Sequence, residues 1–541
     1  MVGFAALTTS CPPKAGDPRA DRDAGPVDIV LSTLNARHLH AAFGLRCLMA
    51  NMGELGDRAR IVEFDINQRP LDIAERILAL RPRILGLGIY IWNVRASLEL
   101  LGVLRRLDPG LCVVLGGPEV SHEIDGQEIV GLADHVVTGE ADLAFAELCR
   151  RVLAGERPPK VLAAPLPDPA RLASPYGLYD DADLAHRVVY VEASRGCPFT
   201  CEFCLSSLDV PVRQFPLESF LADMQQLLGR GLRRFKFVDR TFNLHPLVSR
   251  RIMQFFLERM EPGLFVHFEM VPDRLPEALR ELIVRFPAGS LQFEVGIQTL
   301  DPAVEALIGR RQDHGRMEDN LRWLRQHTGV HVHADLIAGL PGESMEGFGR
   351  GFDRLLGLGP QEVQVGILKR LRGTPIIRHD AEWGMLYSPA PPYEVLRTRL
   401  MTFEDLARMR RFAAFWDLYG NSGNFIRALP MLWREPGASA FASFLAFSDH
   451  LHARGVQTSG IALNRQYELL LAYATGRWPG DVAGWREALA EDYRGPGRRD
   501  VPPFLTPEGT QGRRKDSGRG DGPGLPMRQA RHVGGAGGHR G

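Results

Sequence analysis

Apolar runs that alternate with helical segments organise the first quarter of the chain. Short apolar runs occupy residues 27–31, 60–64, 84–89, 112–115 and 135–138, and helical spacing of apolar residues, as at Leu45, Leu48 and Met49, lies between them. Strands that are apolar along their whole length and separated by helices are typical of a parallel sheet covered on both faces. The pattern therefore predicts a flavodoxin-like (Rossmann-like) α/β domain over residues 26–155.

The same alternation returns after residue 185. Apolar runs at 188–191, 233–238, 265–270, 291–297, 332–337 and 363–367 make six strand candidates separated by helical segments. Six β/α repeats predict a second α/β domain over residues 185–385, joined to the first by a linker at 156–184. In barrels built of such repeats, functional groups collect at the carboxyl ends of the strands.

The last third of the chain has a different period. Apolar residues at three-to-four spacing over 393–418, 436–454 and 463–473 predict a mainly helical C-terminal domain at residues 386–494. Residues 1–25 and 495–541 are rich in Pro, Gly and charged residues, and they are predicted to form a disordered leader and a disordered tail.

Composition narrows the class of protein. The 541 residues carry 65 Lys and Arg and 65 Asp and Glu, so nothing in the charge balance indicates a nucleic-acid partner. Seven cysteines are too few for a disulfide framework. Residues 1–25 do not resemble a secretory signal, and no apolar run approaches the ~18–20 residues of a membrane span. We therefore expect a soluble cytoplasmic protein.

Three of the seven cysteines lie on one short stretch. Cys197, Cys201 and Cys204 form a C-x3-C-x2-C array directly after the apolar run at 188–191. Cysteine thiolates are the usual ligands of [4Fe-4S] clusters, and three of them would leave one iron with an open position. A structural zinc site needs four ligands, and no other Cys or His lies within ten residues. Zinc and unrelated cysteines remain the alternatives.

This spacing is that of the radical S-adenosylmethionine (SAM) enzymes, which the chain resembles. The resemblance implies an open barrel of six β/α repeats and a [4Fe-4S] cluster that cleaves SAM to a 5′-deoxyadenosyl radical. By resemblance, Phe203 lies near the adenine, and Glu294 and Gln298 match positions that face the ribose and methionine of SAM. For a single glutamate, a structural ion pair is the alternative. The other predicted SAM contacts are Asp239, Arg240, Glu269, Gly339 and Pro341.

Polar residues and glycines follow the strands of the first domain. Ligands of parallel sheets bind beyond the carboxyl ends of the strands. Placed before a radical SAM module, this sheet resembles the cobalamin-binding domain of cobalamin-dependent radical SAM enzymes, chiefly through its GGPE and GE turns. Ordinary turn glycines are the alternative. The predicted cobalamin contacts are Ser32, Thr33, Asn35, Trp92, Asn93, Gly116, Gly117, Pro118, Glu119, Gly139 and Glu140.

A histidine ligand to cobalt is not expected. The chain has no match to the D-x-H-x-x-G motif of cobalamin mutases, because His38 and His40 lack the aspartate and the spacing. We expect these two residues at the surface or in contact with the ligand.

The domain order resembles an uncharacterised bacterial subfamily with a helical C-terminal region. The resemblance implies a cobalamin-dependent radical SAM enzyme that methylates an unactivated carbon. Radical cyclisation or rearrangement without methyl transfer is the alternative, and a non-catalytic cluster or cobalamin sensor is a third. No residue is nominated as a general base or nucleophile. The expected partners are a small-molecule or peptide substrate and a low-potential electron donor such as flavodoxin or ferredoxin, with no membrane and no nucleic acid.

Overall fold

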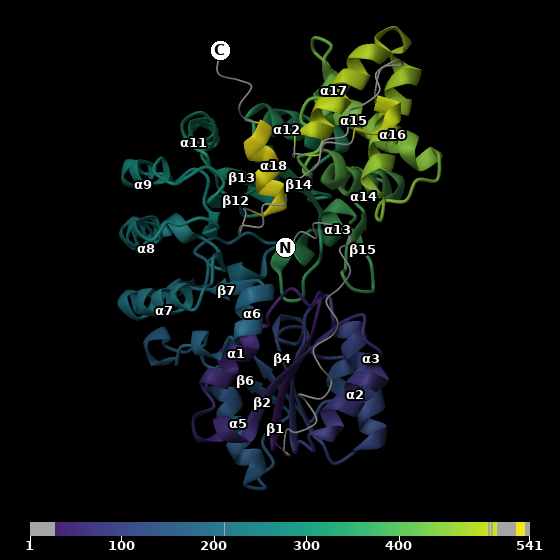
Figure 1. The fold of residues 1–541 in the computed structure, drawn as a ribbon. Coiled ribbons are helices and arrows are strands. Elements are labelled where there is room, and N and C mark those ends of the chain that lie inside the picture. The colour runs from purple at the N-terminus through teal and green to yellow at the C-terminus, as the bar shows by residue number, and fades with distance from the viewer. Residues whose placement is uncertain (1–26, 210, 496–497, 499–500, 506–525, 536–541) are drawn as a thin grey trace.

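The computed structural model of the protein describes residues 27–209, 211–495, 498, 501–505 and 526–535 (Figure 1). The predicted disordered leader, residues 1–25, lies outside this range. The described chain forms a first α/β domain, an open β/α barrel and a helical C-terminal region. The predicted fold class is confirmed.

The first domain is built on a six-stranded sheet in which all neighbouring strands are parallel. The strand order is β2-β1-β3-β4-β5-β6. The sequence predicted five of these strands but not β6, which has only three residues, two of them exposed. The sheet thus extends into the segment assigned to the linker. The strands are β1 (Ile29–Asn35), β2 (Ala59–Asp65), β3 (Ile84–Gly88), β4 (Cys112–Gly116), β5 (His135–Thr138) and β6 (Val161–Ala163).

Helices cover both faces of this sheet (Figure 1). Ile29 and Leu31 pack in one core with side chains of α1 (Phe43–Ala50) and α5 (Ala144–Leu153). Val30 and Leu34 pack in a second core. The helices of that second core are α2 (Pro70–Ala79), α3 (Val94–Leu107) and α4 (Glu128–Gly131). The continuous apolar strands of the sequence are therefore explained by burial on both faces.

Strand β1 is longer than the sequence indicated. Ser32, Thr33 and Asn35 were predicted to follow it as a turn, but all three are buried within it. Their polar groups are satisfied by neighbouring strands: Ser32 Oγ donates to the Val62 carbonyl at 2.8 Å and Thr33 Oγ1 to the Gly88 carbonyl at 2.8 Å. A buried hydroxyl that has a hydrogen-bond partner is tolerated in a central strand. The strand therefore continues through Ser32 and Thr33 although both are polar.

The barrel sheet has the order β14-β13-β12-β11-β10-β7, and all its strands are parallel. Its strands are β7 (Val189–Val191), β10 (Arg234–Phe237), β11 (Phe265–Met270), β12 (Leu291–Gln298), β13 (His331–Ala338) and β14 (Glu362–Ile367). The helices that follow them are α7 (Leu217–Gly229), α8 (Pro246–Glu258), α9 (Glu277–Ile283), α10 (Pro302–Leu307), α11 (His314–His327) and α12 (Met345–Gly357). In Figure 1, α7, α8, α9 and α11 stack along the outside of the sheet.

Alternate residues of these strands separate an apolar from a polar face. Phe293 and Val295 of β12 are buried in the large core that includes the outer helices. On the other face, Glu294 of the same strand lies 3.1 Å from His267 and 3.9 Å from Lys236. The inner face of the barrel therefore carries charge.

The C-terminal region packs on the barrel through aromatic side chains. Phe352 of α12 lies 5.2 Å from Phe412 and 4.8 Å from Trp416, measured between ring centroids. The predicted helix from residue 393 begins only at 403, because Val395 pairs in a short hairpin. The elements are α13 (Asp380–Trp383), β15 (Leu386–Tyr387), β16 (Val395–Arg397), α14 (Phe403–Tyr419), α15 (Ala440–Ala453), α16 (Leu463–Arg477) and α17 (Val482–Arg494).

The predicted disordered tail contains a helix, α18 (Met527–Gly535), that lies against the barrel strands (Figure 1). Arg528 donates to Glu362 at 3.1 Å and to Asp417 at 2.9 Å, and Gln529 donates to Gln292 at 2.6 Å. Glu362 and Gln292 stand at the amino-terminal ends of β14 and β12. The helix was missed because the segment around it is rich in Gly, Pro and Arg, a composition that predicts disorder.

Candidate cofactor site

The three clustered cysteines lie on a loop bracketed by a two-stranded hairpin, β8 (Ser194–Arg195) and β9 (Arg213–Gln214). The loop turns sharply at Gly196, whose φ is +91°. A Cβ there would lie 2.8 Å from the carbonyl oxygens of Asp209 and Pro211. Only glycine fits such a position, so Gly196 aims the chain that follows it, beginning with Cys197.

The three thiols are neighbours in space. Cys197 and Cys201 are buried and Cys204 is half-buried. Burial raises the pKa of Cys197 to about 11, and the charges of Cys204 and Cys201 add to the effect. Within the described residues, no three His, Cys, Asp or Glu side chains are arranged as ligands of a single metal ion. In a [4Fe-4S] cluster each thiolate would bind a different iron, so the three thiols need not converge on one metal ion.

The loop between α10 and α11 holds the cluster loop from the barrel side. Arg310 Nη1 donates to Cys201 Sγ at 3.5 Å, and the Ile308 carbonyl accepts from the Glu202 backbone at 3.0 Å. Gly309 has a φ of +66°, and a Cβ there would lie 2.9 Å from the Thr200 carbonyl oxygen. Sequence analysis missed these residues, and no motif in the sequence points to them.

The segment after β14 holds the same loop from another side. Glu202 is 7% exposed, and its carboxylate accepts from His379 Nε2 at 2.9 Å and pairs with Arg378. Its carbonyl accepts from the Ile376 backbone at 3.0 Å. A buried carboxylate is stable only when paired, so Glu202 ties the cluster loop to residues 376–379.

The predicted SAM contacts at the second and third barrel strands are close to this loop. Asp239 is buried and accepts from Ser194 Oγ at 2.7 Å, and burial raises its pKa to about 6. Arg240 donates to Glu269 at 3.1 Å. The structure therefore brings Asp239 to the cluster loop and pairs Arg240 with Glu269.

The predicted contacts on the fourth and fifth strands show irregular backbone. Gln298 has a φ of +72°, and the β12–β13 register shifts between Gly296 and Gln298. Gly339 has a φ of +88°, and a Cβ there would lie 2.6 Å from Val395 Cγ1. Phe203 and Pro341 are buried. Strained backbone at the carboxyl ends of strands is typical of ligand sites.

Beside the cluster loop lies a cavity of about 150 Å³. Glu192, Arg195, Asp209 and Arg240 supply its charged walls. Burial raises the pKa of Glu192 to about 7 despite the neighbouring Arg195.

Two arginines of the hairpin bind the GE turn of the first domain. Arg195 lies 3.0 Å from Glu140 and 2.9 Å from Asp142, and Arg213 also pairs with Glu140.

After the neighbouring strand, Glu119 of the GGPE turn accepts from Arg372 at 2.8 Å and from the Tyr393 hydroxyl at 2.5 Å. The side chains of Glu119 and Glu140 are thus held in contacts between domains.

Other predicted cobalamin contacts have structural roles. Asn93 is buried and donates to the Gly88 carbonyl at 3.0 Å. Gly117 has a φ of +103°, and a Cβ there would lie 2.5 Å from the Ile89 carbonyl oxygen. Trp92 differs, because it is 41% exposed and stacked on Tyr90. Gly116, Pro118 and Gly139 line the same carboxyl edge, beside Glu119 and Glu140.

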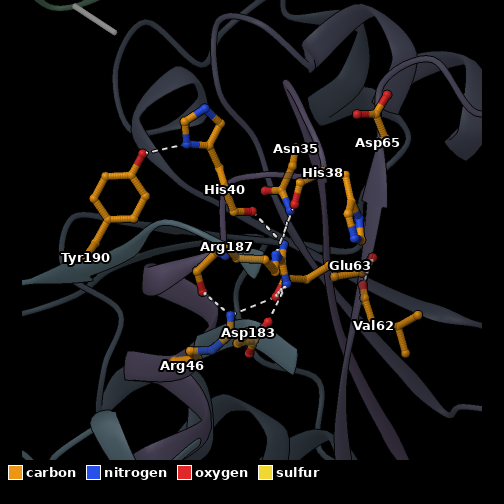
Figure 2. Close-up of polar contacts among 12 residues, drawn as sticks. Asn35, His38, His40, Arg46, Val62, Glu63, Asp65, Asp183, Arg187 and Tyr190 are labelled. Carbon is orange, nitrogen blue, oxygen red and sulfur yellow. Dashed lines mark hydrogen bonds and ion pairs between the residues drawn. The ribbon is translucent and has the colours of Figure 1, made fainter. Parts of the chain in front are cut away.

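A buried ion-pair network joins the first sheet to the barrel (Figure 2). Glu63 of β2 binds Arg46 at 2.7 Å and Arg187 at 2.6 Å, and Asp183 binds the same two arginines. Asp183 lies on α6 (Asp181–His186), which precedes β7. Burial alone would raise the pKa of Glu63, but both arginines outweigh it and lower the pKa to about 2.

His40 belongs to the same junction. Its Nδ1 lies 2.7 Å from the Tyr190 hydroxyl, and its main chain pairs with Val188 beside β7 (Figure 2). His38 is exposed. One ring nitrogen of His40 is therefore engaged by the barrel.

Three sequence profiles match successive parts of the chain. The B12 binding domain matches residues 30–149, the Radical SAM superfamily matches residues 191–355, and a protein family of unknown function (DUF4080) matches residues 381–517. The first two matches coincide with the sheet edge and the cysteine loop described above. The chain carries a B12 binding domain and a radical SAM domain.

Characterised relatives of this radical SAM protein are distant. It is 25% identical over 462 residues to the cobalamin-dependent radical SAM methyltransferase TokK of Streptomyces tokunonensis, covering 75% of this chain and 63% of TokK. It is 26% identical over 318 residues to 2-(S-pantetheinyl)-carbapenam-3-carboxylate methyltransferase of Streptantibioticus cattleyicolor, covering 52% and 46% of the two chains. The matched part thus spans less than two thirds of either relative.

Solved structures share the fold. The radical SAM methyltransferase TsrM of Kitasatospora setae, solved with cobalamin and a [4Fe-4S] cluster, superposes with a TM-score of 0.55 at 16% identity, covering 87% of this chain and all of that one. The cobalamin-dependent SAM radical enzyme OxsB superposes with a TM-score of 0.56 at 12% identity, covering 86% and 83%.

The matched domains imply a [4Fe-4S] cluster, SAM and cobalamin as cofactors, as the sequence predicted. The three neighbouring thiols fit the cluster. The exposed ring of Trp92 and the absence of a D-x-H-x-x-G histidine fit a corrin bound without a protein imidazole. Among the described residues, none of the helices has the length and hydrophobicity that crossing a membrane would need.

Proposed function

We propose that this radical SAM protein methylates an unactivated carbon of its substrate. The observation that supports the proposal is the arrangement of its two cofactor domains. Arg195 follows β7 and binds Glu140 after β5, while Arg372 follows β14 and binds Glu119 after β4. The carboxyl edge of the first sheet therefore faces the carboxyl ends of the barrel strands, and ligands bind at both of these edges.

Methylation of an unactivated carbon needs this arrangement, because both cofactors would have to reach one substrate atom. When bound, the cluster supplies the electron that cleaves SAM, and cobalamin supplies a methyl group. Cys197, Cys201 and Cys204 hold the cluster. Asp239 fixes Ser194 at the start of its loop, and Arg195 keeps that loop against the first domain. These residues orient the two sites, and none is required as a general base.

The test is a product analysis with reconstituted protein. The protein is prepared without oxygen, loaded with iron, sulfide and cobalamin, reduced, and given SAM and fractionated extract of its native cells. Methylation predicts S-adenosylhomocysteine together with 5′-deoxyadenosine. Formation of 5′-deoxyadenosine alone would contradict methylation and favour the second candidate, radical cyclisation or rearrangement. Failure to cleave SAM under all conditions would favour a non-catalytic sensor.

The partners follow from the same proposal. A small-molecule or peptide substrate would enter beside the cluster loop, where Arg195 and Arg240 line a charged cavity. A reduced flavodoxin or ferredoxin would deliver the electron. Replacing the chemical reductant by each of these proteins in the assay tests the donor.

A further inference from the structure

Arg310 is a barrel side chain that contacts one of the three clustered cysteines. Its Nη1 lies 3.5 Å from Cys201 Sγ, although the two residues are 109 positions apart. Arg310 is half-buried, so little water screens its charge at this distance.

The same guanidinium also binds the irregular end of β12. Nη2 of Arg310 donates to the Gly296 carbonyl and, at 2.9 Å, to Gln312 Oε1. Gln312 Nε2 in turn donates to the Ile297 carbonyl at 3.0 Å. A bulge leaves carbonyls of the strand without their ladder partners. The side chains of Arg310 and Gln312 donate to two such carbonyls, those of Gly296 and Ile297, directly before Gln298.

We propose that Arg310 sets the reduction potential of the cluster by donating a charged hydrogen bond to the sulfur of Cys201. Reduction adds one negative charge to the cluster, and hydrogen bonds to its sulfurs and nearby charge determine its potential. A guanidinium beside a ligand sulfur stabilises the reduced form more than the oxidised form. Arg310 therefore raises the potential and makes the cluster easier to reduce.

The contact with β12 gives this arginine a fixed position. Because Arg310 is held at Gly296, its distance to Cys201 depends on the packing of β12, the strand that carries Glu294 and Gln298. The inference requires a bound cluster but not methyl transfer, so it goes beyond the proposed function.

The experiment is a redox titration of the reconstituted cluster, monitored by its electron paramagnetic resonance signal, without SAM or substrate. Iron and sulfide per chain are measured first. In Arg310→Gln we expect the potential to fall by the equivalent of a tenfold or larger change in the reduction equilibrium, about 59 mV for one electron. Arg310→Lys keeps the charge and should lie between Arg310→Gln and the unchanged protein.

Two neighbouring variants are matched controls. Arg311→Gln removes the same charge from the next, exposed residue. Gln312→Ala removes contacts with Arg310, the Ile297 carbonyl and the buried Glu305, but none with Cys201. Both should keep the potential of the unchanged protein.

Each contrary result would overturn the proposal. An unchanged or higher potential in Arg310→Gln would do so, as would an equal fall in Arg311→Gln or Gln312→Ala. If Arg310→Gln binds no cluster, the test is the reduction potential of Arg310→Lys. A potential below that of the unchanged protein supports the proposal, and an equal or higher potential overturns it. If both folded variants lose the cluster, Arg310 is needed for assembly and the tuning role is wrong. Failure of methylation with an intact cluster leaves the proposal standing.

Discussion

Arg195, two residues before the first cluster cysteine, lies 3.0 Å from Glu140 of the B12 binding domain. The same guanidinium also binds Asp142 and Glu192, at 2.9 and 2.7 Å. One side chain thus joins the cluster loop to the edge of the sheet on which cobalamin is expected to bind. Its neighbour Arg213 makes a second connection to Glu140.

Replacement of Arg195 should weaken the contact between the two domains. In Arg195→Gln, the buried carboxylates of Asp142 and Glu192 and the half-buried one of Glu140 lose a shared cation. Breaking a buried ion pair costs roughly 3–5 kcal/mol. We expect a lower melting temperature and faster amide exchange at residues 139–142, measured by hydrogen exchange with mass spectrometry. Arg230→Gln is the control, because its pair with Asp181 is exposed. Unchanged exchange at 139–142 would argue against the connection.

Gly309 should be intolerant of a side chain. Alanine would have to adopt a φ near +66° with its Cβ 2.9 Å from the Thr200 carbonyl oxygen, so the cluster loop would have to move. Unfavourable backbone alone costs about 1–3 kcal/mol. We expect Gly309→Ala to bind less iron per chain after reconstitution. Gly455→Ala has a similar φ of +69° with open space around it and should keep full iron content.

The Glu63 network should make stability depend on pH in the acid range. The pKa of Glu63 is about 2 in the folded protein against an ordinary 4.5. A depressed carboxyl pKa stabilises the fold above pH 4.5, and this stabilisation is lost as the pH falls toward 2. The difference corresponds to about 3 kcal/mol.

Melting temperatures of Glu63→Gln and the unchanged protein between pH 6 and pH 3 test this. The unchanged protein should lose stability more steeply, so the two curves should converge at low pH. The control is Glu54→Gln, which removes an exposed carboxylate that pairs with Arg150. Parallel curves for Glu63→Gln and the unchanged protein would contradict the prediction.

Loss of one clustered thiol should abolish the cluster. In Cys197→Ala, two thiolates would remain for a cubane that three are expected to hold. Iron content and the visible absorbance of the reconstituted protein should fall to background. Cys112→Ala, which removes a thiol in the first domain, should leave both unchanged. Full iron content in Cys197→Ala would mean that the assigned ligands are wrong.

Local pattern was enough to predict the two parallel sheets. Alternate residues of strands such as β11 and β12 are apolar because they are buried on the outer face of the barrel. A period of two residues is visible within a short stretch of sequence. The spacing of Cys197, Cys201 and Cys204 likewise predicts the cluster on one loop, because these three cysteines are close together in the sequence. Strand β6 was not predicted because it has only three residues, two of them exposed. Helix α18 was not predicted because the tail that contains it is rich in Gly, Pro and Arg.

The charged contacts were decided only by tertiary structure. Sequence analysis placed Glu119 and Glu140 at a cofactor edge, but it could not show that Arg372 and Arg195 bind them. Arg310 had no recognisable signal, since its contact with Cys201 exists only when β12 packs beside the cluster loop. The chain has many arginines, and the one that pairs with a given carboxylate or thiol is the one that packing brings close to it. The local spacing of residues in the sequence does not contain that distance.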